Sequence, residues 1–159
     1  MAYTPVLATL GFILSEDRRS VLMVHRTARE RDMQYGYFNG LGGKLEPGED
    51  IVECIKREIF EESGLTVESV QLRGTVSWPG YGDDCFGFIF LIDGYSGEPY
   101  SSNEEGELSW QPISELSELH MMEGDKDFVP LVFDATISQF HVVIPYRDGV
   151  PTGFSGTLL

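Results

Sequence analysis

The sequence predicts an α+β domain in which a mixed β-sheet lies between helices. Three observations lead to this fold class: an opening pair of β-forming segments, an acidic amphipathic helix near the middle, and further strands around a second helix. The length of 159 residues and the hydrophobic content of 42% suffice for one full core. We find no internal repeat or linker, so residues 1–159 are expected to form a single domain.

The N-terminal segments are predicted to form a β-hairpin. Tyr3 to Leu14 is rich in β-forming residues and ends in the polar turn SEDRRS. Val21 to Arg26 then returns as the second strand. The charged segment Thr27 to Tyr35 is expected to be a loop, and Tyr37 and Phe38 are expected to be strand residues.

The central helix is predicted between the turn at residues 47–48 and Gly64. Acidic residues follow the turn, where the positive end of a helix favours them, and glycine is the usual residue just after a helix. Ile51, Ile55 and Ile59 recur every four residues and form an apolar stripe. We therefore expect one face of this helix to pack on the sheet.

The end of the same helix carries a group of carboxylates. Glu58 and Glu62 continue the apolar line by helical spacing, and Glu61 lies beside them. The basic residues of the helix are expected to pair with partners that include Glu53 and Glu61, which leaves Glu58 and Glu62 poorly neutralised. A solvated acidic face is one interpretation. The other is a cation site, because clustered carboxylates with only oxygen ligands suit Mg²⁺ or Mn²⁺.

The second half of the chain is predicted to contain strands, loops and one more helix. The expected elements are strands at 66–78 and 85–93, a loop at 94–106, a short turn or helix at 112–119, a helix at roughly 126–137, a strand at 139–146 and a last short pairing at 156–159. Pro130 is expected in the first turn of the second helix, where proline is tolerated.

The amino-acid composition limits the kinds of partner that this protein is expected to bind. The net charge of −15 argues against nonspecific binding to nucleic acid polymers or anionic membranes, but not against a small phosphorylated substrate held with divalent cations. Cys54 and Cys85 lack metal-ligand spacing and are expected to be free thiols, which suits a reducing compartment. The apolar run Val6 to Leu14 is too short to span a bilayer. We expect a soluble cytoplasmic protein, monomeric or homodimeric.

The stretch from Gly43 to Leu65 matches the Nudix box, G-x5-E-x7-R-E-U-x-E-E-x-G-U, in which U is apolar. The match holds at every fixed position: Gly43, Glu49, Arg57, Glu58, Ile59, Glu61, Glu62, Gly64 and Leu65. Seven fixed letters would coincide by chance in roughly one of 10⁸ to 10⁹ windows. The chain therefore resembles a Nudix hydrolase over nearly its whole length. The resemblance implies the Nudix α/β/α sandwich and cleavage of a nucleoside diphosphate linked to another moiety.

The resemblance also implies a metal-dependent site at the central helix. Glu58, Glu61 and Glu62 would hold Mg²⁺ or Mn²⁺ together with the Gly42 carbonyl. Arg57 would orient these carboxylates through charge-assisted hydrogen bonds.

Two site residues are expected outside the box. Many Nudix enzymes place one more glutamate a few residues before a tryptophan, as a metal ligand or base. Counting back from Trp110, Glu105 fits best and Glu104 is the alternative. A basic residue at the end of the strand before the box contacts substrate in the family, which assigns Arg26 to substrate binding. A solvated strand-end arginine is the plainer interpretation.

The segment FNGLGGK resembles the WNGFGGK-type segment of enzymes that sanitise oxidised purine nucleotides. It assigns base recognition to Asn39, whose amide both donates and accepts hydrogen bonds, although a turn asparagine is also common. Gly43 and Lys44 are assigned to substrate binding as well.

The segment MMEGDKDFVP resembles the base-pocket segment of the eukaryotic-type sanitising enzyme. Asp125 aligns with a base-reading aspartate. Met122 stands where the family stacks a tryptophan, and Gly124 stands where a second aspartate is expected. A methionine packs against a purine less specifically, so a broader purine triphosphatase stays open.

These features favour Mg²⁺-dependent hydrolysis of a nucleoside triphosphate, such as 8-oxo-dGTP, to the monophosphate and pyrophosphate, in sanitation of the nucleotide pool. The alternatives are cleavage of ADP-ribose or a dinucleoside polyphosphate, and a catalytically silent nucleotide sensor. Because the box keeps all its glutamates, the sequence favours an enzyme.

Overall fold

A computed structural model describes residues 1–159. The chain forms eleven strands, two α-helices and one 3₁₀-helix. The bounds are β1 Val6–Leu14, β2 Ser20–Arg26, β3 Phe38–Asn39, β4 Leu41–Lys44, α1 Ile51–Ser63, β5 Thr66–Trp78, β6 Cys85–Ser96, β7 Gly106–Pro112, η1 Ile113–Glu118, α2 Glu123–Val132, β8 Phe140–Val143, β9 Tyr146–Arg147, β10 Val150–Pro151 and β11 Ser155–Leu158. No helix is long and apolar enough to cross a membrane.

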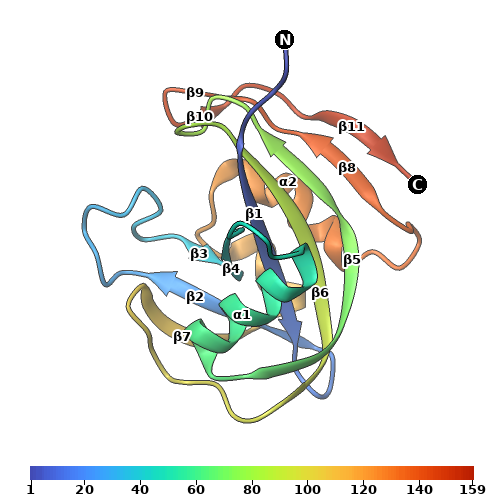
Figure 1. The fold of residues 1–159 in the computed structure, drawn as a ribbon. Helices are drawn as coiled ribbons and strands as arrows, with labels where there is room; N and C mark the ends of the chain where they lie inside the picture. Colours follow the sequence, from blue (N-terminus) through green and yellow to red (C-terminus); the bar gives the residue numbers. More distant parts are fainter.

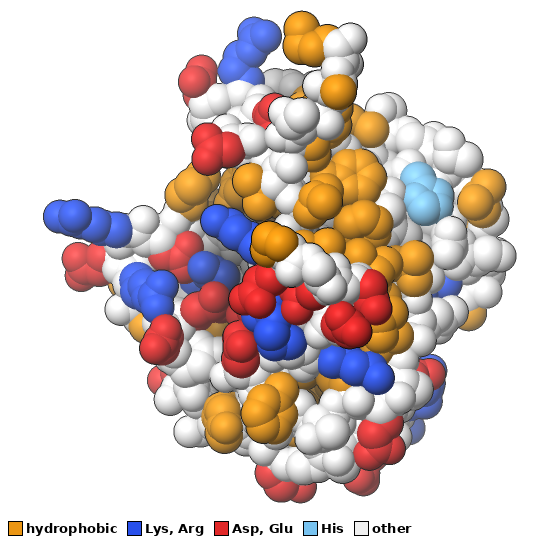
Figure 2. Space-filling model, viewed as in Figure 1, with side chains coloured by type: hydrophobic (Ala, Val, Ile, Leu, Met, Phe, Trp, Pro, Cys, Tyr) orange, Lys and Arg blue, Asp and Glu red, His pale blue; other side chains and the backbone are white.

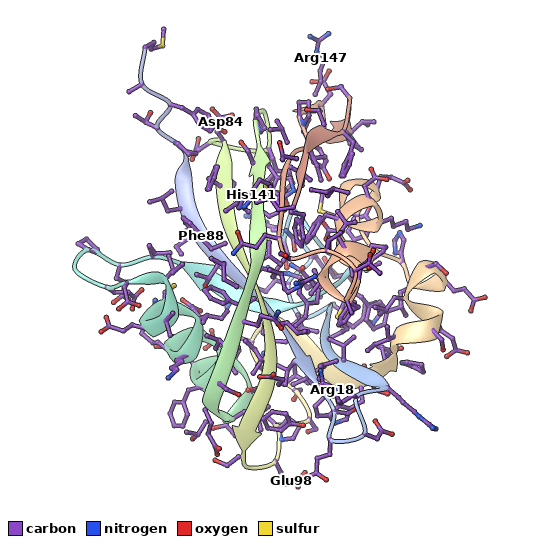
Figure 3. All side chains as sticks on the ribbon, turned by 90° about the vertical axis from the view of Figure 1, so that its right-hand side faces the viewer. Arg18, Asp84, Phe88, Glu98, His141 and Arg147 are labelled. Atoms are coloured by element: carbon purple, nitrogen blue, oxygen red, sulfur yellow. The ribbon has the colours of Figure 1, made fainter.

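The sheet is mixed and has a helix on each face. Its strand order is β11-β8-β5-β6-β1-β2-β3, with β4 paired to β1 and β7 paired to β2, while β9 and β10 form a separate ribbon. Strand β1 runs parallel to β6, and β5 runs parallel to β8, whereas the other pairs are antiparallel. Helices α1 and α2 lie on opposite sides of the sheet, as Figures 1 and 3 show. The predicted α+β class and the α/β/α sandwich are therefore confirmed.

Several predicted elements are confirmed. The opening segments form the β1–β2 hairpin, β5 has the predicted bounds, and β11 pairs with β8. Both cysteines are free. Strand β6 runs three residues beyond the predicted end at Asp93, because its pairing with β5 continues to Ser96.

Helix α1 begins and ends at the residues the sequence indicates. Asp50 caps it by accepting hydrogen bonds from the N–H groups of Val52 and Glu53, and the Glu53 carboxylate accepts from the N–H of Asp50. Gly64 ends it with φ of 79°, a left-handed conformation that glycine adopts without strain. This reciprocal cap fixes where the first turn of α1 leaves the loop that follows β4.

The predicted second helix was misplaced. It was expected at 126–137 but spans Glu123–Val132, and Pro130 lies in its last turn rather than its first. Asp134 accepts hydrogen bonds from the N–H and the hydroxyl of Thr136, so the chain turns there instead of continuing as a helix. An apolar pattern alone cannot show that this local turn ends the helix.

Two strands also differ from expectation. The predicted strand at 139–146 is split into β8 and β9, because Pro145 has no N–H to donate to a ladder. Strand β7 was not predicted, although it pairs with β2 along its full length. Its glycine, glutamate and proline residues lower its β-propensity, and the pairing with β2 together with the burial of Leu108 compensates for this.

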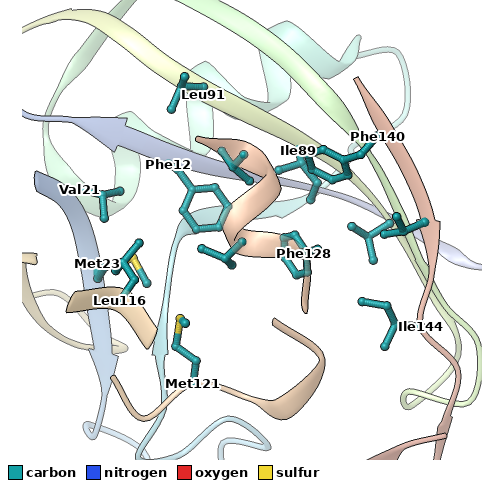
Figure 4. Close-up of a cluster of buried hydrophobic side chains, with 14 of the residues drawn as sticks. Phe12, Val21, Met23, Ile89, Leu91, Leu116, Met121, Phe128, Phe140 and Ile144 are labelled. Atoms are coloured by element: carbon teal, nitrogen blue, oxygen red, sulfur yellow. The ribbon is translucent and has the colours of Figure 1, made fainter. Parts of the chain in front are cut away.

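The core consists of two apolar clusters, one on each face of the sheet. Because neighbouring strand residues point to opposite faces, Phe12 of β1 packs toward α2, whereas Ile13 packs toward α1. Figure 4 shows Phe12, Ile89 and Phe128 in the cluster under α2. Ile55 and Ile59, both fully buried, anchor α1 to the other face, as the predicted stripe requires.

A buried arginine holds the end of α2. Arg73 on β5 is 4% exposed, and its guanidinium donates hydrogen bonds to main-chain carbonyls around the end of the helix. Three of these bonds measure 2.8 to 3.0 Å, to Asp134, Ser138 and Val132. Arg73 thereby supplies donors to carbonyls that a helix end leaves without partners.

We predict that Arg73→Met destabilises the protein by about 3 kcal/mol, because several buried carbonyls lose their donor at once. Urea unfolding measures the loss. Arg147→Met, which removes an exposed arginine on β9, is the matched control and should change the free energy of unfolding little. A loss below about 1 kcal/mol for Arg73→Met would contradict the structural role of this arginine.

Candidate active site

A cavity of about 300 Å³ opens along β4 and the end of β2. Eight residues that the sequence assigned to substrate or metal binding lie together on the walls of this cavity. They are Arg26, Asn39, Gly42, Gly43, Lys44, Glu105, Met122 and Asp125. The box glutamates of α1 lie next to one end of the cavity, through the contact of Glu62 with Gly42 and of Glu58 with Gly43.

Glu62 is the most perturbed of these acids. Its Oε2 accepts a hydrogen bond of 3.0 Å from the N–H of Gly42. Burial, together with the negative charges of Glu105 and Glu58, raises the pKa of Glu62 to about 9. Burial likewise raises the pKa of Glu58, although the neighbouring Arg57 opposes this. Ionisation of these carboxyl groups at the end of α1 is therefore unfavourable, because the surrounding side chains do not fully neutralise them.

Arg57 organises the outer part of this group. It donates two hydrogen bonds of 2.9 Å to Glu49, one of 2.9 Å to Glu58 and one of 3.3 Å to Glu61. The pairing with Arg57 lowers the pKa of Glu49 to about 2. Figure 2 shows the acidic side chains gathered around basic ones on the face that α1 covers.

The expected pairing within α1 was wrong in one respect. Glu53 accepts from the N–H of Asp50 as part of the helix cap and takes no part in an ion pair with the basic residues of the helix. Arg57 instead reaches Glu58, so Glu58 is neutralised on one side. Helical spacing alone missed this contact because Glu58 is the sequence neighbour of Arg57.

Gly43 leaves the room that Glu58 occupies. A Cβ atom at this position would lie 2.4 Å from Cδ of Glu58 and 2.6 Å from each carboxylate oxygen. Any side chain on residue 43 would therefore displace the Glu58 carboxylate. The first glycine of the box is required by the close approach of β4 to α1.

The geometry separates the two candidates for the additional glutamate. Glu105 accepts a hydrogen bond of 3.3 Å from Arg26, lines the cavity, and lies close enough to raise the pKa of Glu62. Glu104 pairs with Arg29 at 3.0 Å, and its side chain is 89% exposed. Only Glu105 faces the box glutamates.

The donor chemistry of this end fits a hard divalent cation, since every candidate ligand is an oxygen atom. The side chains as they lie do not place three acidic, histidine or cysteine residues around one point. Glu58 and Glu61 are turned toward Arg57, so both would have to rotate to share a cation with Glu62. The assignment of metal ligands stays a prediction.

The other end of the cavity is lined by uncharged and aromatic groups around Asp125. Burial raises the pKa of Asp125 to about 7. The structure adds Gln34, Trp78 and Tyr81 to the predicted Asn39 and Met122. Trp78 stands at the end of β5, and aromatic residues at a strand end beside a glycine turn are the only sequence signal that points to it.

Gly124, where the resemblance expects a second aspartate, has no room for one. A Cβ atom at this position would lie 2.5 Å from the hydroxyl oxygen of Tyr146. Tyr146 itself lines the cavity. This end of the cavity therefore carries one aspartate and a tyrosine instead of two aspartates.

Comparisons with known proteins agree with this fold. A NUDIX domain model matches residues 4–132. The chain is 32% identical over 132 residues to the oxidized purine nucleoside triphosphate hydrolase of Danio rerio, covering 82% of this chain and 81% of that protein. It is 34% identical over 95 residues to the uncharacterized Nudix hydrolase YvcI of Bacillus subtilis, covering 57% of this chain and 60% of YvcI, which is less than two thirds of that relative.

A solved structure is also similar. The MutT protein of Bacillus halodurans superposes with a TM-score of 0.81 at 26% identity, covering 94% of this chain and 96% of that one. The chain therefore belongs to the Nudix family and is a Nudix hydrolase. Nudix hydrolases act on small nucleotide substrates and generally use divalent cations such as Mg²⁺.

We predict that the metal-free protein loses stability as pH rises from about 4.5 to about 9, the ordinary and the folded pKa of Glu62. Over this range the folded state holds a proton that the unfolded state releases, so deprotonation favours unfolding. Glu62→Gln keeps an acceptor for Gly42 but cannot ionise. Between pH 5 and pH 8 the free energy of unfolding should therefore fall less in Glu62→Gln than in the wild type. The two decreases should differ by at least about 1 kcal/mol.

Urea unfolding in the presence of a chelator measures both curves. Glu68→Gln, at an exposed position on β5, is the control and should follow the wild type. Parallel curves for wild type and Glu62→Gln would show that Glu62 titrates normally in the folded state.

Proposed function

We propose that this chain hydrolyses an oxidised purine nucleoside triphosphate, such as 8-oxo-dGTP, to the monophosphate and pyrophosphate, with Mg²⁺ or Mn²⁺. The single observation that carries this proposal is the shared cavity. The residues assigned to a purine, Asn39, Met122 and Asp125, lie on the same 300 Å³ cavity as Glu105 and the glycines that contact the box glutamates. The similarity to a relative named as an oxidized purine nucleoside triphosphate hydrolase supports the choice of substrate.

The metal end would bind the triphosphate. Glu58, Glu61, Glu62 and Glu105 would hold the cation together with the Gly42 carbonyl. When bound, such a cation neutralises phosphate oxygens and makes water easier to deprotonate. The burial that raises the pKa of Glu62 also favours a positive partner there, so a cation competes with a proton for this carboxylate.

The remaining polar residues would position the substrate. Arg26 and Lys44 are the basic side chains on the cavity wall, where they can contact phosphate oxygens. Arg57 holds Glu58 and Glu61 until the cation enters. Glu105 either joins the ligands or accepts the proton of the attacking water. Release of pyrophosphate with a monophosphate places the cleaved bond between the α and β phosphates.

The base end would select the purine. Trp78 and Tyr81 offer aromatic surfaces, which compensates for the methionine at position 122. The pKa of Asp125, about 7, makes both its protonated and its ionised form available near neutral pH, so it can donate or accept a hydrogen bond. This pocket is compatible with the sanitation role in the nucleotide pool that the sequence favours.

We predict that Glu61→Gln and Glu62→Gln each lower kcat for 8-oxo-dGTP with Mg²⁺ by about a thousandfold, close to 4 kcal/mol of transition-state stabilisation, while the fold persists. A pyrophosphate-release assay over a nucleotide panel measures this, with circular dichroism as the test of folding. Glu68→Gln is the control. Full activity in either variant would refute the assignment of these carboxylates.

The same panel separates the alternatives. Monophosphate plus pyrophosphate supports the proposal. AMP plus a sugar phosphate or a second nucleotide would instead indicate ADP-ribose or dinucleoside polyphosphate hydrolysis. Tight binding of a nucleotide without any product would indicate a nucleotide sensor.

We also predict that Trp78→Ala raises KM for the preferred purine nucleotide, whereas Trp78→Phe largely keeps the wild-type value. Stacking of a base on an aromatic side chain contributes about 1–3 kcal/mol, equivalent to roughly a 5- to 150-fold change in affinity. Steady-state kinetics at saturating Mg²⁺ measure the change. An unchanged KM in Trp78→Ala would exclude this ring from base binding.

A further inference from the structure

Gln34 joins two groups at the base end of the cavity. It lies between β2 and β3, lines the cavity, and was given no role by the sequence. Its Oε1 accepts a hydrogen bond of 2.6 Å from Nδ2 of Asn39, and its Nε2 donates one of 3.0 Å to the hydroxyl of Tyr81. The side chain therefore spans the gap between the asparagine assigned to the base and one aromatic wall.

The main chain around Gln34 is held in place. Asp32, whose side chain is 10% exposed, pairs at 2.5 Å with Nε of Arg26 through one oxygen. Its other oxygen accepts the N–H of Gln34 at 3.0 Å. The N–H of Gly36 donates to the carbonyl of Arg26 at 2.6 Å, which closes the loop behind Gln34. The position of Gln34 is thus fixed to the end of β2.

The bond to Gln34 determines which atoms Asn39 offers to a ligand. One Nδ2 hydrogen of Asn39 is committed to Gln34, whereas its Oδ1 accepts no hydrogen bond from the protein. No buried side-chain oxygen or nitrogen in the chain lacks a partner, so this Oδ1 is accessible. Asn39 lines the cavity, so this accessible oxygen is the acceptor that its side chain can offer to a base bound there.

We propose that Gln34 is a positioning residue for base recognition, which holds the Asn39 carbonyl oxygen toward the substrate and so selects bases that present a hydrogen-bond donor there. This inference rests on the proposed binding of a purine nucleotide in this cavity.

The chemistry of purines connects this acceptor to oxidation. Guanine presents two acceptors, N7 and O6, on its major-groove edge. Oxidation at C8 converts N7 into an N–H donor and leaves O6 as an acceptor. An asparagine whose carbonyl faces that edge accepts from the oxidised base but meets a lone pair on guanine. Selectivity then depends on keeping the amide of Asn39 from turning over.

Two substitutions at the same position test the proposal. Gln34→Leu removes the acceptor, so the Asn39 amide can turn and offer its NH₂ group instead. Gln34→Glu has a similar shape but can only accept, so it holds Asn39 in the orientation described above. The matched control is Gln71→Leu, which removes an exposed glutamine on β5 away from this cavity.

The readout is the ratio of the dissociation constants of dGMP and 8-oxo-dGMP, measured by titration calorimetry. A ratio cancels any uniform effect of the added charge or of a small loss of stability. We expect wild type, Gln71→Leu and Gln34→Glu to prefer 8-oxo-dGMP with ratios that agree within about threefold. In Gln34→Leu the ratio should fall by about tenfold, the effect of losing one oriented hydrogen bond.

Three outcomes would overturn the inference: a wild-type protein without preference, an unchanged ratio in Gln34→Leu, or a ratio in Gln34→Glu that falls as far as in Gln34→Leu. The last result would mean that Asn39 accepts from Gln34. Because monophosphate binding needs no turnover, selective binding without hydrolysis of 8-oxo-dGTP would contradict the proposed function and leave this inference standing.

Discussion

The site depends on the burial of neighbouring carboxyl groups at the end of α1. Glu62 is desolvated beside Glu58 and Glu105, and the main-chain N–H of Gly42 is the only hydrogen-bond donor to its carboxyl group in the protein. Ile55 and Ile59 cannot leave the core, so α1 cannot move away to relieve the repulsion. The packing of α1 on the sheet thereby keeps these carboxyl groups close together. A cation is the natural partner for them when they ionise.

The cavity is assembled from elements that are far apart in the sequence. The side to which the proposed function assigns the phosphates is formed by β4 and the end of β2, while the side that it assigns to the base receives residues from β5 and from the start of α2. Asp32 touches both sides, because it pairs with Arg26 and also holds the main chain of Gln34. Under the proposed function, recognition of the two halves of a nucleotide would thus be built on one short loop.

The sequence was most informative where local rules determine the structure. The acidic residues after the turn at 47–48, the glycine at position 64 and the spacing of the isoleucines located α1, and the box located the acids beside it. The sequence failed where long-range contacts decide. The end of α2 depends on Arg73, sixty residues away, and β7 is stabilised by its pairing with β2. Gln34 looked like one more polar loop residue, since only the fold places it beside Asn39.

Arg73 has a consequence beyond stability. It joins β5 to the last carbonyls of α2, while the first residues of the same helix, with Met122 just before it, carry Asp125 into the cavity. Helix α2 has only ten residues, which corresponds to a length of about 15 Å, so its end and its beginning belong to one short element. Under the proposed function, substrate preference would therefore be open to change through substitutions at the far end of α2, at positions that do not line the cavity.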